Sequence, residues 1–175
     1  MAGSLIKIKE TIVSSGVSSV TLTGIDSTYE VYLLVMNNVS PDTADADVFL
    51  RVTESGSASA DSDYDMAYKL LRADTTFNNI NNTNQAQWGI SGSLENDTGK
   101  TFNGHCYIFN ANNSSEYTFI TTENVYLAED GTMLGQAGGG VYTQTTTVDG
   151  VSIQCLEGGS GNIDAGTFTL YGLKK

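Results

Sequence analysis

The segment "GTFTLYGL", residues 166–173, decides the fold that we predict for this chain. Phe168 and Leu170 share one face of the segment, while the threonines and Tyr171 take the other. A strand of this kind is stable only when it pairs with neighbouring strands and buries its apolar face. We therefore predict that this segment completes a β-sandwich.

The same two-residue alternation recurs along the chain, whereas helical spacing is rare. In "LIKIKETIV" it places Ile6, Ile8 and Ile12 on one face. Turn signals rich in Gly, Asn, Asp and Ser separate the alternating segments. The pattern predicts an all-β protein, a single antiparallel, jelly-roll-like sandwich of about eight to ten strands over residues 1–175.

Three stretches depart from simple alternation. Residues 29–38, "YEVYLLVMNN", are apolar nearly throughout, which predicts a central strand covered on both faces by the core and by a neighbouring subunit. Residues 76–89, "TFNNINNTNQAQWG", form the longest polar insertion, which we expect to be a loop with a short turn fixed by Trp88. Residues 1–12 are expected to form an attachment arm or an edge strand.

The charge excludes two classes of partner. The chain has 20 acidic and 8 basic side chains, giving a formal net charge of −12. Nucleic-acid binding and adsorption to anionic membranes both need an excess of Lys and Arg, so we expect neither. Copies of the chain repel each other unless they meet through uncharged faces.

The sequence also bears on the compartment. The start of the chain shows no signal-peptide pattern, and the apolar run near Val31–Met36 is too short to span a bilayer. We therefore expect a soluble protein that is made in the cytoplasm.

Nothing in the sequence forms a recognisable catalytic centre. His105 is the only histidine, and its neighbour Cys106 should point to the opposite face of the strand, so the two cannot easily pair. No nucleophile motif of the G-x-S-x-G type is present. Cys106 and Cys155 lie in apolar runs and are expected to be buried free thiols. We expect no enzymatic activity and no cofactor.

One acidic motif resembles a calcium loop. Asp61, Asp63 and Asp65 alternate as the first ligands of such a loop do. Met66 then stands where a tight turn requires Gly, and Arg72 stands where a bidentate Glu belongs. We therefore interpret the motif as a solvated acidic loop, and the three aspartates as weak metal candidates only.

Aromatic residues are the better candidates for contacts with partners. The chain has nine Tyr, six Phe and one Trp. Tyr and Trp are enriched at protein interfaces, although both also fill cores with the polar atom at the rim. The candidates for interface or recognition contacts are Trp88, Tyr142 and Tyr171.

Two segments resemble small virion structural proteins of marine tailed bacteriophages. They are residues 21–41, "TLTGIDSTYEVYLLVMNNVSP", and the ending "SGNIDAGTFTLYGLKK", residues 160–175, in which a small-residue turn precedes a strand closing on "LYG". Residues 107–120 follow the same order of strand, Ser/Asn turn and strand. The match is loose over residues 52–72 and in the loop around Trp88.

The resemblance implies a jelly-roll-like structural protein of the virion, assembled as a homotrimer, with no catalytic residues. The first hypothesis is a decoration, cement or knob-like protein that binds the major capsid protein or other virion proteins. It would dock through uncharged strand faces and the N-terminal segment. The second is a tail-fibre tip or receptor-binding module, whose loops around Trp88 and at residues 135–144 recognise a host-surface glycan or protein. The third, a glycan hydrolase or esterase, is disfavoured.

Overall fold

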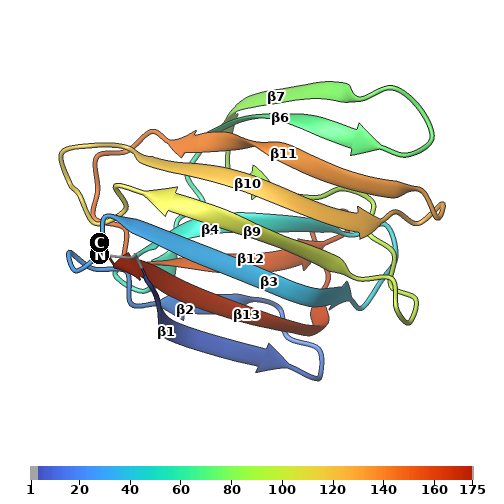
Figure 1. The fold of residues 1–175 in the computed structure, drawn as a ribbon, viewed down its shortest axis with the longest axis horizontal. Helices are drawn as coiled ribbons and strands as arrows, with labels where there is room; N and C mark the ends of the chain where they lie inside the picture. The colour runs from blue at the N-terminus through green and yellow to red at the C-terminus, as the bar shows by residue number, and fades with distance from the viewer. Residues whose placement is uncertain (1–3, 175) are drawn as a thin grey trace.

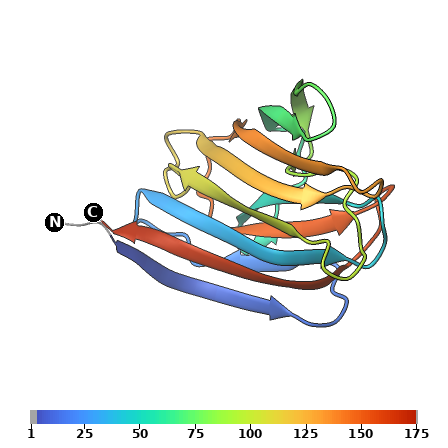
Figure 2. The same cartoon turned by 45° about the vertical axis from the view of Figure 1, so that its right-hand side comes forward.

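The computed structural model describes residues 4–174. Strands and isolated bridges make up 63% of the residues that the structure describes, and none of these residues is helical. Two antiparallel sheets lie face to face, as Figures 1 and 2 show. The predicted all-β sandwich is therefore confirmed.

The larger sheet has eight strands in the order β1-β13-β3-β9-β10-β11-β6-β7. In that order the strands span Ser4–Val13, Ile163–Lys174, Val31–Pro41, Phe102–Phe109, Thr118–Leu127, Met133–Tyr142, Tyr64–Arg72 and Asn78–Gln85. The β1 and β7 strands are the two edges, at the bottom and top of Figure 1.

The smaller sheet has the order β2-β12-β4-β5, and β8 pairs separately with β4. In the order β2, β12, β4, β5, β8 these strands span Val20–Thr23, Gly150–Leu156, Asp47–Glu54, Ser57–Ala58 and Trp88–Gly89. Successive strands β1 to β4 alternate between the two sheets, and β12 and β13 return between them. This interleaving is the jelly-roll-like feature of the fold.

The core fills the space between the inner faces of the two sheets. Phe168 and Leu170 of the last strand are fully buried there, as their alternation predicts. Opposite them, β12 places Ile153 between Val20 of β2 and Leu50 of β4, all of them buried. Close packing of such branched side chains is what stabilises a sandwich of this size.

The strand predicted to be covered on both faces is covered completely on only one. In β3, Leu34 and Met36 are buried in the core. On the other face, Leu33 is buried by its neighbours within the sheet, but Val35 is partly exposed and Asn37 is exposed.

Two stretches expected to be loops are strands. Residues 78–85 form β7, which pairs antiparallel with β6, and residues 133–142 form β11 through the middle of the glycine-rich segment. Both lack an apolar/polar alternation, because β7 is exposed on nearly all positions and β11 is rich in glycine. These strands and the two-residue strands β5 and β8 raise the total above the expected eight to ten.

The first strand differs from the expected pattern at one point. A β-bulge between Lys7 and Lys9 shifts the register of β1 against β13. Because a bulge reverses the alternation of the side chains that follow, Ile8 packs against the core while Ile12 is 70% exposed. The prediction of a shared face for Ile6, Ile8 and Ile12 is therefore wrong. Within the segment expected to be an arm or edge strand, residues 1–3 lie outside the described residues.

Candidate functional site

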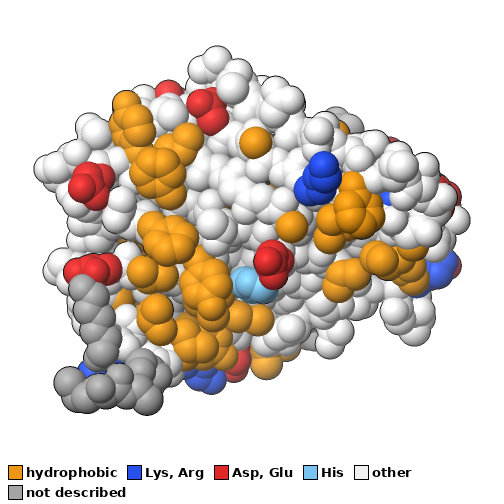
Figure 3. Space-filling view, turned by 45° about the horizontal axis from the view of Figure 1, so that its top comes forward, with side chains coloured by type: hydrophobic (Ala, Val, Ile, Leu, Met, Phe, Trp, Pro, Cys, Tyr) orange, Lys and Arg blue, Asp and Glu red, His pale blue; other side chains and the backbone are white. Residues whose placement is uncertain are grey.

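The outer face of the eight-stranded sheet, which points away from the smaller sheet, carries a patch of aromatic and aliphatic side chains. Its centre is a row of directly opposed residues on adjacent strands. Tyr171 of β13 pairs with Leu33 of β3, which pairs with Tyr107 of β9, which pairs with Thr121 of β10. In Figure 3 the hydrophobic side chains gather on this face.

A second apolar row runs beside the first. Phe109 of β9 lies between Val31 of β3 and Phe119 of β10, and Phe119 in turn lies opposite Val141 of β11. Phe119 is 44% exposed. The Tyr107 and Phe109 rings lie 6.4 Å apart, centroid to centroid. The two rows together form one apolar patch, which we call the outer patch.

Few charges interrupt the outer patch. Along β3, β9 and β10, all within the described part of the chain, the only outward-facing acidic or basic side chains are His105 and Glu123. They lie directly opposite each other on β9 and β10. The His105 ring stands edge-on to Tyr107, with 5.7 Å between the ring centroids. The pale-blue side chain in Figure 3 marks where this pair borders the patch.

An open hollow lies beside this pair. It has a volume of about 570 Å³ and is lined by Val35, Asn37, His105, Tyr107 and Glu123, among others. An aromatic ring, a carboxylate and an amide around one hollow are groups that can hold a polar ligand with an apolar face.

The outer face of the smaller sheet is different. Its side chains are mostly polar, with Phe49 as an exception, and Thr21 Oγ1 donates to Ser152 Oγ at 3.4 Å. Arg51 Nε donates to the backbone oxygen of Ala86 at 3.2 Å. Of the two outer faces, the face of the eight-stranded sheet is therefore the better suited to bind an apolar partner.

Trp88, predicted to be a recognition residue, lies in the core. It is fully buried, packs edge-on against Tyr64 with centroids 4.9 Å apart, and donates from Nε1 to the backbone oxygen of Asp65 at 3.1 Å. A buried indole cannot stack on a ligand at the surface, so this prediction is wrong. The physical reason is that β8 pairs with β4 at the edge of the smaller sheet and directs Trp88 inward.

Tyr142 is also buried, with 1% of its surface exposed. Its hydroxyl donates to Glu54 Oε1 at 2.8 Å and lies 2.9 Å from Ser59 Oγ. Burial, together with Glu54, raises the pKa of Tyr142 to about 12. Tyr142 therefore packs in the core with its hydroxyl hydrogen-bonded, and its assignment as a surface contact is wrong.

Tyr171 is the one predicted aromatic candidate that reaches the outer patch. It lies between Lys7 of β1 and Leu33 of β3 and is half-buried. The sequence pattern did not single out Tyr107 or Phe119 as contact residues. The segment "HCYIF" does carry a signal for Tyr107, since it is apolar on both of its alternating faces, which indicates a strand with a second contact surface.

The three aspartates of the calcium-like motif do not form a cluster. No group of three His, Cys, Asp or Glu side chains among residues 4–174 could hold a metal ion. Asp65 Oδ1 instead accepts a hydrogen bond from the backbone nitrogen of Asn84 at 2.8 Å. The motif ties the start of β6 to the end of β7.

Both cysteines are buried free thiols, as predicted. Burial raises the pKa of Cys106 to about 11 and that of Cys155 to about 12. Thiols with such values stay protonated at neutral pH and are poor nucleophiles. His105 points to the outer face while Cys106 lies in the core, so the two cannot act together.

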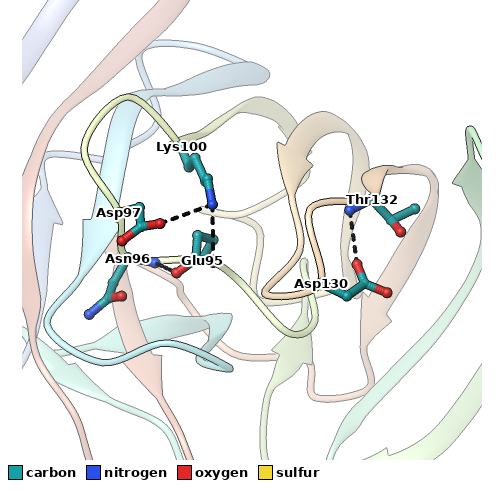
Figure 4. A network of polar contacts seen from close by, with 6 residues as sticks. All are labelled: Glu95, Asn96, Asp97, Lys100, Asp130 and Thr132. Atoms are coloured by element: carbon teal, nitrogen blue, oxygen red, sulfur yellow. Dashed lines mark hydrogen bonds and ion pairs between the residues drawn. The ribbon is translucent and has the colours of Figure 1, made fainter.

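A network of polar contacts holds the loop before β9 (Figure 4). Lys100 Nζ lies 3.0 Å from Asp97 Oδ2 and 3.4 Å from Glu95 Oε2. Nearby, Asp130 Oδ1 accepts from the backbone nitrogen of Thr132 at 2.9 Å. Lys100 is therefore engaged with acidic groups of its own loop.

Comparisons of this chain with protein-family models, with curated proteins and with solved structures gave no match. Within residues 4–174 there is no helix of the length and apolarity needed to cross a membrane.

Proposed function

We propose that this protein is a structural component of a bacteriophage virion that decorates the head surface as a cement or knob-like protein. The sequence resemblance supports the assignment to a phage particle. The outer patch supports a docking role, and it is the observation on which the proposal depends.

The argument starts from charge. A chain of net charge −12 repels copies of itself and other acidic surfaces. Docking is favoured where burial of apolar area is not opposed by desolvating charges, and the outer patch offers such an area. Tyr107, Tyr171 and Phe119 supply large contact area with few rotatable bonds. The partners we propose are the major capsid protein or another virion protein, with the chain assembled as a homotrimer.

Repetition makes modest contacts sufficient. A capsid presents the same surface many times, so a symmetric assembly of this chain can engage several copies of that surface at once. Avidity then raises the total affinity above that of one outer patch.

The test is an image of the virion at a resolution that shows strands. Density for this sandwich on the head shell, with the outer patch against the shell, is the expected result. Density only at the tail, or particles without the chain, would overturn the proposal.

The hollow beside His105 favours a second candidate, a receptor-binding module that recognises a host-surface glycan. Tyr107 could stack on a sugar face while Glu123 and Asn37 accept or donate hydrogen bonds. The experiment is binding of the purified protein to host cells, with Tyr107→Ala as the variant. Binding that this substitution removes would support the second candidate, and no binding to host cells would exclude it.

A further inference from the structure

The β7 strand is an edge strand with an unusual composition. It pairs with β6 on one side, and no strand of the described chain pairs with its other side. Ile80 alone is half-buried in it, and its other residues are exposed. The β6–β7 hairpin stands out from the top of the molecule in Figures 1 and 2. A strand with so little burial gains stability from a further partner.

The opposite edge of the sheet is protected against such pairing. The β1 strand carries Lys7, Lys9 and Glu10 and contains the β-bulge. Charges and bulges are the devices by which edge strands avoid pairing with other chains. The β7 strand, "NNINNTNQ", has no charged residue, although the chain has 28 of them (20 acidic plus 8 basic). The exposed edge of β7 is therefore open to pairing.

The regular part of β7 is a palindrome. Residues 78–82 read "NNINN" in both directions, and they pair without interruption with Leu70 to Met66 of β6. The irregular part, where the register shifts and Asn84 has a φ of 55°, begins only after Asn82. A palindromic strand can pair antiparallel with a second copy of itself so that each residue meets one of its own kind.

We propose that two copies of this chain associate by antiparallel pairing of their β7 strands about a two-fold axis at Ile80. The two eight-stranded sheets then become one continuous sheet. This contact does not use the outer patch, and in the homotrimer proposed above it would join two trimers into an assembly of six copies. An isologous interface of this kind requires a self-complementary surface, and "NNINN" supplies one.

Each pair of side chains in this arrangement is compatible. Asn78 meets Asn82 of the second copy and Asn79 meets Asn81, so amides lie opposite amides and can exchange hydrogen bonds. Asn79 Oδ1 already accepts from Lys69 Nζ at 2.8 Å, which leaves its amide nitrogen to donate. No like charges are brought opposite each other, which would oppose pairing.

At the axis itself, Ile80 meets Ile80 of the second copy. On its own chain Ile80 borders a hollow of about 380 Å³ whose lining is apolar at Tyr68, Leu70 and Leu134 and also includes the charged side chains of Asp45, Asp47 and Arg72. Pairing therefore extends an apolar surface that already exists on the inner side of the hairpin.

The axis position allows a charge-complementation test on the full chain. Ile80→Lys and Ile80→Glu each place like charges opposite each other at the axis, so each variant alone should lose the contact. An equimolar mixture places Lys opposite Glu and should recover it. Light scattering after size exclusion is the readout. The wild type is expected as a dimer or an even multiple, each variant at half that mass, and the mixture at the full mass again.

A crosslink gives an independent readout. Directly opposed Cα atoms of an antiparallel pair lie about 4.5–5.5 Å apart, within the range of a disulfide. Ile80→Cys should therefore form a covalent dimer on mild oxidation, and the native thiols are buried and should not compete. Lys9→Cys, on the protected edge, is the matched control and should not crosslink.

Three results would overturn the inference. One is a wild-type monomer at high concentration. Another is an assembly whose mass both Ile80 variants leave unchanged, including a trimer that uses other surfaces. The third is a mixture that stays at half mass while each variant keeps a native β-sheet circular-dichroism spectrum.

Discussion

Gly140 of β11 lies directly beneath the indole of Trp88: a Cβ atom built on Gly140 would come 2.5 Å from Trp88 Nε1. It would also lie 2.8 Å from the backbone oxygen of Asp65, which accepts the indole hydrogen bond. The glycine therefore leaves the space in which Trp88 is buried. This contact links the glycine-rich strand to the hydrogen bond that fixes the tryptophan.

Gly140→Ala should destabilise the fold by about 1–3 kcal/mol, because the added methyl group forces the indole out of a well-packed site. Guanidinium unfolding followed by the fluorescence of Trp88, the only tryptophan, measures the change. Gly89→Ala is the matched control, since its Cβ would meet only two Phe49 ring carbons, at 3.6 and 3.9 Å, which is ordinary van der Waals contact. Equal stability of the two variants would contradict this account of the glycine.

Substitutions in β1 should report the reversal of its alternation at the bulge. Ile12→Lys is expected to change the unfolding free energy by less than about 0.5 kcal/mol, because Ile12 is 70% exposed. Val13→Lys should cost about 3 kcal/mol or more, because Val13 lies in the core and a lysine there loses its hydration. Thermal unfolding of the two variants side by side tests this. A larger loss of stability for Ile12→Lys than for Val13→Lys would contradict the reversal at the bulge and would support the unbroken alternation that the sequence predicts.

The strands differ in how well the alternation of the sequence predicts them. Alternation predicts the inner faces of β4 and of residues 167–172 of β13 correctly, because Val48, Leu50, Val52, Phe168 and Leu170 are buried and strand pairing is uninterrupted over these parts. It fails in β1, because a bulge leaves no trace in the order of residues. It fails in β7, because a strand exposed on both faces has no apolar side to alternate.

The candidate site follows the same logic. The alternation of residues 167–172 predicts that Tyr171 lies on the outward face of its strand. The prediction of an exposed Trp88 is wrong because the polar sequence around it gives no sign of burial, and only the pairing of β8 with β4 directs it inward. The outer patch combines residues from strands far apart in the sequence, such as Leu33 and Tyr107. Its continuity depends on strand order, which local alternation does not specify.

Stability should fall in alkaline solution through the two thiols. Burial raises the pKa of Cys106 from 9.0 to about 11, so the folded state holds this proton after the unfolded chain has released it. The neutral thiol contributes about 2–3 kcal/mol to the free energy of unfolding below pH 9, and this contribution is lost as the pH rises toward 11. Cys155, raised to about 12, acts in the same direction.

Unfolding free energies at pH 8 and pH 10.5, measured under reducing conditions, check this effect. The double variant Cys106→Ala and Cys155→Ala should lose less stability between the two pH values than the wild type does. Burial also raises the pKa of tyrosines such as Tyr126, to about 12. These tyrosines make the unfolding free energy fall with pH in both proteins. Identical slopes would show that the thiols are not the source.

The outer patch can be tested by a charge placed in its second row. Phe119 is 44% exposed and lies between Phe109 and Val141, so Phe119→Glu should change stability by less than about 1 kcal/mol. It should nevertheless abolish attachment to phage heads that lack the protein, because a carboxylate would be desolvated against an apolar partner.

Phe77→Glu is the matched control for this experiment. Phe77 is 54% exposed but lies in the turn between β6 and β7, away from the outer patch. The control should attach to heads as the wild type does, in a sedimentation assay with purified heads. If both variants attach equally well, docking does not use the outer patch. If both fail, charge anywhere on the surface is responsible, and the patch loses its special role. If the outer patch is the docking surface, only Phe119→Glu should lose attachment to the heads.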